Sequence, residues 1–303
     1  MEIMTVLGPV SPDTMGITLP HEHLLIDVYE IVRDYGATLD DEDLAIEELN
    51  LFKNAGGRTV VDLTSIGIGR DPLALKRISV ATGVQVIMGS GWYREAVYPS
   101  YIQSKSVDEL AEMILHDLES GADGTGIKPG VIGEIGTERG YITPSQERVF
   151  RAAARAHKKS GRAIVTHCTH LGELAMEQLA LLREEGVDPR RVIISHMGDR
   201  RHIRLELPVV KAGAYVSFDH IGLASFQHDS QRAKCVLELI KEGYLRQILL
   251  SHDICFTSHL RWYGGRGYDF LLVSFVPMLK AAGLDDEQIH TILVENPCRA
   301  FAY

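Results

Sequence analysis

The residues His21-Glu22-His23 place two imidazoles two positions apart, directly after the apolar run 16–20. In a β-strand, side chains at positions i and i+2 point to the same face, so this pair has the geometry of a chelate for a divalent metal ion. A histidine pair on the polar edge of a strand gives the same pattern. The metal interpretation therefore depends on finding further ligands elsewhere in the chain.

Other apolar runs also carry a histidine or a carboxylate near their ends: Glu134 in VIGEIGT, His167 in AIVTH, His196 in VIISH and Asp253 in LLSHD. Taken singly, a histidine at a strand end is commonly a hydrogen-bonded core residue, and an aspartate there is commonly the N-cap of the next helix. Glu134 differs, because a carboxylate among apolar neighbours is expected to be buried and must be paired or metal-bound.

The recurrence of these residues predicts one shared metal site. Four histidines and two carboxylates are too few for two octahedral ions, but they suit two four- or five-coordinate ions that share a bridging ligand. Histidine and carboxylate ligands fit Zn²⁺ best on coordination type, with Mn²⁺ and Co²⁺ as alternatives.

The elements that must position these residues are strands and helices that alternate along the whole chain. Short β-branched runs are followed by longer amphipathic stretches, a pattern typical of βα units with a parallel sheet. Helix starts are recognisable at 40–43 and at Thr143-Pro144. Eight strands are predicted, over residues 17–26, 59–65, 84–89, 131–136, 163–167, 192–196, 214–218 and 247–251. With no G-x-G-x-x-G after the first strand, this pattern favours a closed (β/α)8 TIM barrel. The binuclear metal site is then expected at the C-terminal ends of the strands.

Composition limits the remaining possibilities. The chain of 303 residues has 45% hydrophobic residues and no linker or low-complexity tract, so residues 1–303 are predicted to form a single domain. A formal net charge of -10 argues against a nucleic-acid partner. With no secretory signal and no apolar segment long enough to span a membrane, a cytoplasmic protein without a membrane partner is expected. The widely spaced cysteines, without a C-x-x-C motif, are predicted to be free thiols: Cys168, Cys235, Cys255 and Cys298.

The pattern Gly16-x-Thr18-x-x-His21-Glu22-His23, followed by Glu134, His167, His196 and Asp253, resembles the phosphotriesterase family of the amidohydrolase superfamily, and within it the phosphotriesterase homology proteins. The segments GWYREAVYP, GEIGTERGYITPSQERVFRAAA and GRAIVTH extend the likeness over nearly the whole chain, to Asn296-Pro297. The resemblance implies a metal-dependent hydrolase and, through the family, a homodimer.

Carried over to this sequence, the resemblance implies that His21, His23 and Asp253 bind the more buried ion and that His167 and His196 bind the more exposed one. Glu134 would bridge the two ions. Many family members use a carbamylated lysine as the bridge, so glutamate implies that assembly needs no carbon dioxide. Lys128 in GIKPG is the one nearby lysine and the alternative candidate for the bridge.

The resemblance also implies a reaction. Two ions would hold a bridging hydroxide that attacks an ester or lactone carbonyl or a phosphoester, with Asp253 as general base. His220 and Asp199 would relay the proton to solvent, although Asp199 is equally simply explained as the N-cap of a helix over 204–210. The lactonase branch usually has arginine where His220 stands, which disfavours a dedicated acyl-homoserine lactonase.

Small-molecule substrate contacts are expected from loops after two strands. Trp92, Tyr93 and Tyr98 after the third strand, with Arg261, Trp262 and Tyr263 after the eighth, predict an aromatic wall with a cationic anchor; loop packing is the alternative for the aromatics. Arg261 and Arg266 either bind an anionic substrate group or are solvated. The alternatives to an ester hydrolase are a non-catalytic binding protein that keeps the barrel and its metal site, and an amide hydrolase.

Overall fold

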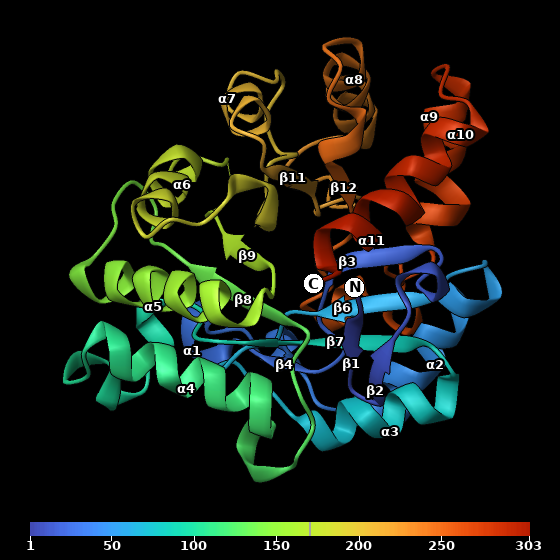
Figure 1. Ribbon diagram of the computed structural model, residues 1–303. Helices are drawn as coiled ribbons and strands as arrows, with labels where there is room; N and C mark the ends of the chain where they lie inside the picture. Colours follow the sequence, from blue (N-terminus) through green and yellow to red (C-terminus); the bar gives the residue numbers. More distant parts are fainter. Residues whose placement is uncertain (170) are drawn as a thin grey trace.

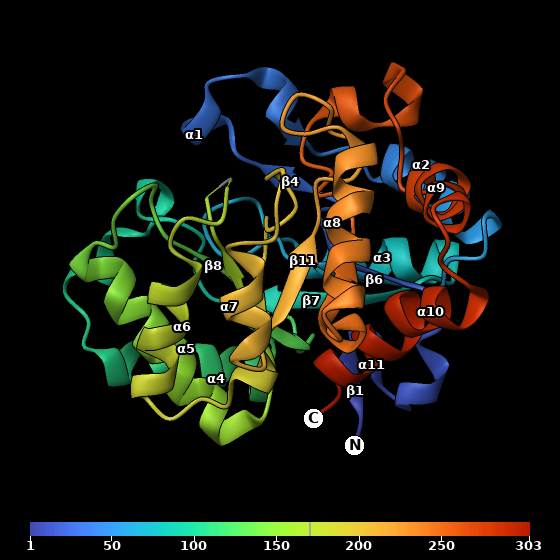
Figure 2. The ribbon, with the colours of Figure 1, turned by 90° about the horizontal axis from the view of Figure 1, so that it is seen from above.

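An eight-stranded parallel sheet lies at the centre of the computed structural model, which describes residues 1–169 and 171–303 (Figure 1). Neighbouring strands follow chain order: β3 (Thr18–Glu22), β6 (Thr59–Asp62), β7 (Gln85–Ser90), β8 (Val131–Gly136), β9 (Ile164–His167), β10 (Val192–Ile194), β11 (Tyr215–Phe218) and β12 (Ile248–Leu250). Helices surround the sheet on its outside (Figures 1 and 2). The architecture is the predicted (β/α)8 barrel.

The barrel is nearly closed between its first and last strands, where side chains bridge the gap. The Ser251 hydroxyl donates to a carboxylate oxygen of Glu22 at 2.8 Å and accepts the backbone N–H of His21 at 3.1 Å. The backbone N–H of Asp253 donates to the carbonyl oxygen of His21 at 3.3 Å. Residues more than 200 positions apart are thereby brought together at one end of the barrel.

The predicted first strand is divided in the structure. β3 ends at Glu22, and β4 (Ile26–Asp27) pairs antiparallel with β5 (Thr38–Leu39) outside the barrel. The division coincides with a contact from another strand, because the backbone N–H of Leu24 donates to the Asp62 carboxylate at 2.7 Å instead of extending the sheet. Six of the other seven predicted strands contain an observed one, and in the remaining one, 84–89, β7 extends one residue beyond the predicted end.

The helices begin and end where the sequence supplies caps. Asp41 accepts the N–H of Leu44, and Thr143 forms a capping box with Gln146. The helices are α1 (Tyr29–Val32), α2 (Glu42–Asn54), α3 (Pro72–Thr82), α4 (Val107–Ser120), α5 (Pro144–Ser160), α6 (Ala175–Glu184), α7 (Glu206–Lys211), α8 (Asp229–Lys241), α9 (Val276–Ala281), α10 (Asp286–His290) and α11 (Asn296–Phe301). None in the described ranges is long and apolar enough to cross a membrane.

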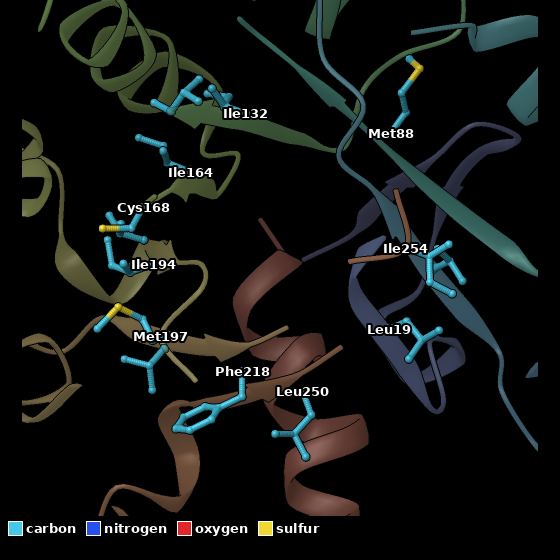
Figure 3. Close-up of a cluster of buried hydrophobic side chains, with 14 of the residues drawn as sticks. Leu19, Met88, Ile132, Ile164, Cys168, Ile194, Met197, Phe218, Leu250 and Ile254 are labelled. Atoms are coloured by element: carbon cyan, nitrogen blue, oxygen red, sulfur yellow. The ribbon is translucent and has the colours of Figure 1, made fainter. Parts of the chain in front are cut away.

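The strands are apolar on both faces because both are buried. Ile194 and Leu250 belong to the larger core between sheet and helices, shown in part in Figure 3, whereas Ile193 and Leu249 belong to a smaller core inside the barrel. Phe301 of α11 is fully buried in this inner core. The chain ends near its own start, with β1 (Ile3–Thr5) and β2 (Gly8–Val10) forming an N-terminal hairpin.

Candidate metal centre

The six predicted ligands meet at the C-terminal end of the barrel. His21 and Glu134 lie within strands β3 and β8, His167 is the last residue of β9, and His23, His196 and Asp253 follow strands β3, β10 and β12. A cavity of about 540 Å³ opens above them, and all but His21 line it. Parallel strands bring these side chains together because their carboxyl ends share one rim.

One half of the cluster consists of His21, His23 and Asp253, whose donor atoms lie within 4.8 Å of one another. Oδ1 of Asp253 is 3.2 Å from Nε2 of His23 and 3.7 Å from Nε2 of His21. All three side chains are largely withdrawn from solvent, with exposures of 1, 2 and 13%. Of these three residues, His21 alone does not line the cavity.

Glu134 connects the two halves. Its Oε1 lies 2.8 Å from Nδ1 of His167, 3.1 Å from Nε2 of His196 and 3.5 Å from Nε2 of His21. Burial alone would raise the pKa of Glu134, but the charges of His167 and His21 outweigh it and hold that pKa well below its ordinary value. Glu134 is therefore ionised and faces three imidazoles through one oxygen.

Asp219 fixes the rings of two histidines from behind. Its Oδ1 accepts both the backbone N–H and the Nδ1–H of His196 at 2.9 Å, and its Oδ2 lies 3.0 Å from Nδ1 of His21. These contacts favour a proton on each Nδ1, so that a neutral ring would offer its Nε2 lone pair to a cation in the cluster. The hydroxyl of Ser195 lies a further 3.0 Å from Nδ1 of His21.

Thr64 does the same for His23. The threonine hydroxyl donates to the carbonyl oxygen of Leu25 at 2.8 Å, so the same oxygen accepts Nδ1–H of His23 at 3.0 Å. Nε2 of His23 lies 3.2 Å from Oδ1 of Asp253, so a cation bound between them would take the lone pair of this nitrogen. Sequence reasoning missed Asp219, Ser195 and Thr64, although each polar residue follows or ends an apolar strand run and this position was the available signal.

These residues fit a divalent-metal centre. Nε2 of His21 is buried and has no hydrogen-bond partner, which is unfavourable unless a cation takes its lone pair. Nitrogen and carboxylate donors in this number suit two ions with a shared carboxylate. Lys128 lies three residues before the N-terminal end of β8 and so at the opposite end of that strand from this rim, which leaves Glu134 as the bridging candidate.

A chain of hydrogen bonds leads away from Asp253. Its Oδ2 lies 3.1 Å from Nε2 of His220, and Nδ1 of His220 lies 2.5 Å from Oδ2 of Asp199. The buried guanidinium of Arg232 donates to the other oxygen of Asp199 at 2.9 Å. Asp199 does not cap the next helix, since α7 begins at Glu206 with Leu205 at its N-cap.

The electrostatics of this chain increase the proton affinity of His220, which lies between two carboxylates. Burial lowers the pKa of His220, but the charge of Asp199 outweighs it, so the net shift is upward. Burial raises the pKa of Asp199 and of Asp253, yet contacts with His220 and other cations hold both below their ordinary values. His220 is therefore held between two carboxylates that stabilise its cationic form.

The cavity wall differs from the predicted aromatic wall. Of the six residues predicted to contact substrate, Tyr93 alone lines this cavity, with its hydroxyl 3.3 Å from Nε2 of His167. Trp92 is fully buried and donates its indole N–H to the Tyr101 hydroxyl, and Tyr98 lies in the packed loop beside it. Arg261, Trp262 and Tyr263 lie outside the cavity, and the indole of Trp262 is 70% exposed.

Comparison with known proteins agrees with this geometry. The model of the phosphotriesterase family matches residues 1–301. The chain belongs to the phosphotriesterase family. The phosphotriesterase homology protein of Escherichia coli is 39% identical over 292 residues, covering 96% of this chain and 100% of the relative. The crystal structure of the Escherichia coli protein, with phosphate in its active site, superposes with a TM-score of 0.93 over the same shares of the two chains.

The names of other relatives in the family state different activities. An aryldialkylphosphatase of Saccharolobus solfataricus is 34% identical, covering 97% of each chain, and an N-acetyltaurine hydrolase of Tetraodon nigroviridis is 33% identical, covering 98% of this chain and 96% of the relative. A lactonase from Listeria monocytogenes has a TM-score of 0.94 at 30% identity, covering 100% of this chain and 99% of that one. The family thus includes hydrolases of phosphoesters, lactones and amides.

Proposed function

We propose that this member of the phosphotriesterase family is a binuclear metal-dependent hydrolase of ester bonds, acting on a carboxylic ester or lactone or on a phosphoester. Its metal ligands are His21, His23 and Asp253 for the deeper ion, His167 and His196 for the outer ion, and Glu134 between them. Zn²⁺ is the ion that this donor set suits best.

One observation carries the proposal: the carboxylate of Asp253 belongs to the ligand cluster and to the hydrogen-bond chain at once. Its Oδ1 faces His23 at 3.2 Å, and its Oδ2 faces His220 at 3.1 Å. A ligand that served only to hold an ion would not need a buried imidazole and a second carboxylate lined up behind it. The arrangement suits proton removal beside a reacting atom.

When bound, two divalent ions supply an activated water at neutral pH and polarise the carbonyl or phosphoryl oxygen of the substrate. Asp253 takes the proton of that water on Oδ2 and passes it to Nε2 of His220. Asp199 accepts the Nδ1–H of His220 and stabilises the imidazolium that results, and Arg232 holds Asp199 in place. Since His220 lines the cavity, the proton can leave to solvent.

Beyond the metal centre the cavity wall has an apolar part, which suits the hydrocarbon part of a substrate, and a polar part that includes Asp34 and Arg94. Its apolar lining consists of Ile26, Val28, Ile31, Val32, Ile68, Leu223, Phe226 and Phe256. We treat residues 1–303 as one hydrolase domain, supported by the single barrel sheet that carries every ligand. The homodimer and the cytoplasmic location stay predictions.

The test combines metal analysis with turnover of a panel containing an aryl ester, a γ-lactone, a phosphotriester and an N-acetyl amide. We expect two ions per chain, hydrolysis of an ester-type substrate, and loss of that hydrolysis on chelation or in Asp253→Ala. Asp286→Ala, which removes an exposed carboxylate paired with Lys280, is the matched control and should retain activity.

Three results would contradict the proposal. Hydrolysis by metal-free Asp253→Ala would show that neither the metal nor this base is needed for the reaction. Two bound ions without turnover of any substrate would favour the binding protein, and turnover of the amide alone would favour the amide hydrolase. Glu134→Gln gives an internal check, because loss of the bridge should lower the occupancy of both ions together.

A further inference from the structure

A second cavity, of about 570 Å³, adjoins the cavity of the metal centre. The two share Leu223, Ser258 and His259 in their linings. The second cavity lies between the loop after β11 and the loop after β12, and its remaining lining includes Arg261 and Arg266. The two cavities therefore lie side by side, with the shared residues between them.

Arg266 is a mostly buried cation without a carboxylate partner. Its guanidinium donates to the carbonyl oxygen of His252 at 2.7 Å, its Nε is buried without a partner, and no ion pair to it occurs among the described residues. Arg261, in the same loop, is instead neutralised by Asp269 at 2.6 Å. Burial lowers the pKa of Arg266, although the charges of Glu22, Asp253 and Asp229 act in the opposite direction. Since none of these carboxylates forms an ion pair with Arg266, an anion in the cavity would supply a direct partner.

The arginine is held firmly in position. A Cβ at Gly222 would lie 2.1 Å from Cδ of Arg266, so the side chain passes directly over bare backbone. The carbonyl to which it donates belongs to His252, the residue before Asp253. The guanidinium is therefore fixed next to the segment that carries a proposed metal ligand.

His259, in the shared wall, offers a donor without a competing charge. Burial and the nearby charge of Arg266 lower the pKa of His259 to about 3, so its ring is neutral. Because its Nδ1 accepts the backbone N–H of Cys255 at 3.4 Å, the ring proton is on Nε2. A neutral imidazole N–H and an unpaired guanidinium thus lie in one cavity lining, and both are donors.

We propose that the second cavity is an anion subsite, in which Arg266 binds a carboxylate, sulfonate or phosphate group carried by the substrate whose ester bond is cleaved at the metal centre. The hydrolysis of this substrate rests on the proposed function. The binding of an anion by Arg266 does not depend on it. It narrows the substrate to an ester with an apolar segment and a terminal oxyanion.

The kinetic test compares two esters that differ only in that group, mono(4-nitrophenyl) adipate and 4-nitrophenyl hexanoate. In Arg266→Met, the ratio of kcat/KM for the anionic ester to that for the neutral ester should fall about tenfold or more, as expected for a lost charged hydrogen bond. Arg266→Lys should restore part of the ratio. Arg246→Met removes an exposed arginine elsewhere and should leave the ratio unchanged. An unchanged ratio in Arg266→Met would overturn the proposal.

A binding test separates this inference from the hydrolase proposal. Propane-1-sulfonate, a poor metal ligand, is titrated into the metal-loaded wild type and the metal-loaded Arg266→Met variant by ligand-observed NMR, after thermal melts establish that both are folded. We expect saturable binding to the wild type and about tenfold weaker binding to the variant. If no ester is hydrolysed, this comparison still tests whether Arg266 binds the anion. Equal binding to the two proteins would refute the subsite.

Discussion

Asp219 gives a sharp test of how the metal centre is built, because it touches no proposed ion and yet fixes two proposed ligands. One of its oxygens accepts from His196, and the other lies 3.0 Å from Nδ1 of His21. Asp219→Asn keeps the size and shape of the side chain but replaces one acceptor by a donor. The amide nitrogen must then face Nδ1–H of one of these two histidines.

The magnitude follows from the two contacts. If the amide nitrogen faces His21, two donors meet at 3.0 Å, and the histidine must move its proton to Nε2, where it blocks the lone pair. Ser195, 3.0 Å from the same Nδ1, can accept in place of Asp219 and limits the loss. If the nitrogen faces His196 instead, both the ring and the backbone N–H lose their acceptor. We expect metal affinity to fall about 10- to 100-fold, equivalent to about 1.4 to 2.8 kcal/mol.

The assay is a competition titration of Zn²⁺ against a chromophoric chelator, with circular dichroism to establish that the variant is folded. Glu206→Gln is the control, since it changes a buried carboxyl outside the ligand cluster. That variant should bind both ions like the wild type. The reasoning is refuted if Asp219→Asn binds both ions within about twofold of the wild-type affinity while remaining folded.

Two further predictions concern stability. Burial raises the pKa of Glu206 from 4.5 to about 7, so the folded state keeps a proton that the unfolded chain releases, and stability falls as the pH rises through this window. The free energy of unfolding of Glu206→Gln relative to wild type should therefore rise by about 2 to 3 kcal/mol from pH 5 to pH 8 in urea denaturation, and a constant difference would contradict this. Gly222→Ala should cost about 1 to 3 kcal/mol more than Gly243→Ala, because both positions have φ near +90° but a methyl group at Gly222 alone meets Arg266. Arg266→Ala should remove that excess, and equal costs for the two glycine variants would show that the contact is not rigid.

The barrel was predictable because its signals are local and repeated. β-branched runs such as Val192–Ile194 and capping residues such as Thr143 specify elements within a few positions. The ends of the first predicted strand were wrong because the Asp62 carboxylate, 38 positions away along the chain, takes the N–H of Leu24. A long-range contact of this kind leaves no periodic pattern in the sequence.

The ligand cluster was predictable for a similar reason, since a histidine or carboxylate at a strand end stands out against apolar neighbours. Its supporting residues were not. Asp219 and Thr64 acquire their roles from where Oδ and Oγ atoms lie relative to ring nitrogens, which depends on the register of neighbouring strands. The wall of the cavity was also beyond reach, because whether Trp92 faces a substrate or the core depends on how its loop folds back onto Tyr101.

The backbone at the metal centre gives a further reason why local propensity fails there. His196 and Asp253 have φ values of +61° and +53°, a left-handed conformation that costs non-glycine residues of order 1 to 3 kcal/mol. In each case the backbone N–H is held by the site itself, that of His196 by Asp219 at 2.9 Å and that of Asp253 by the carbonyl oxygen of His21 at 3.3 Å. Aspartate and histidine adopt this conformation more often than most other non-glycine residues, but it is still uncommon for them, so we infer that the contacts of the cluster select it. The turn that follows each strand then points the side chain back toward the barrel axis, and the strain is located at the two residues whose direction matters most for binding an ion.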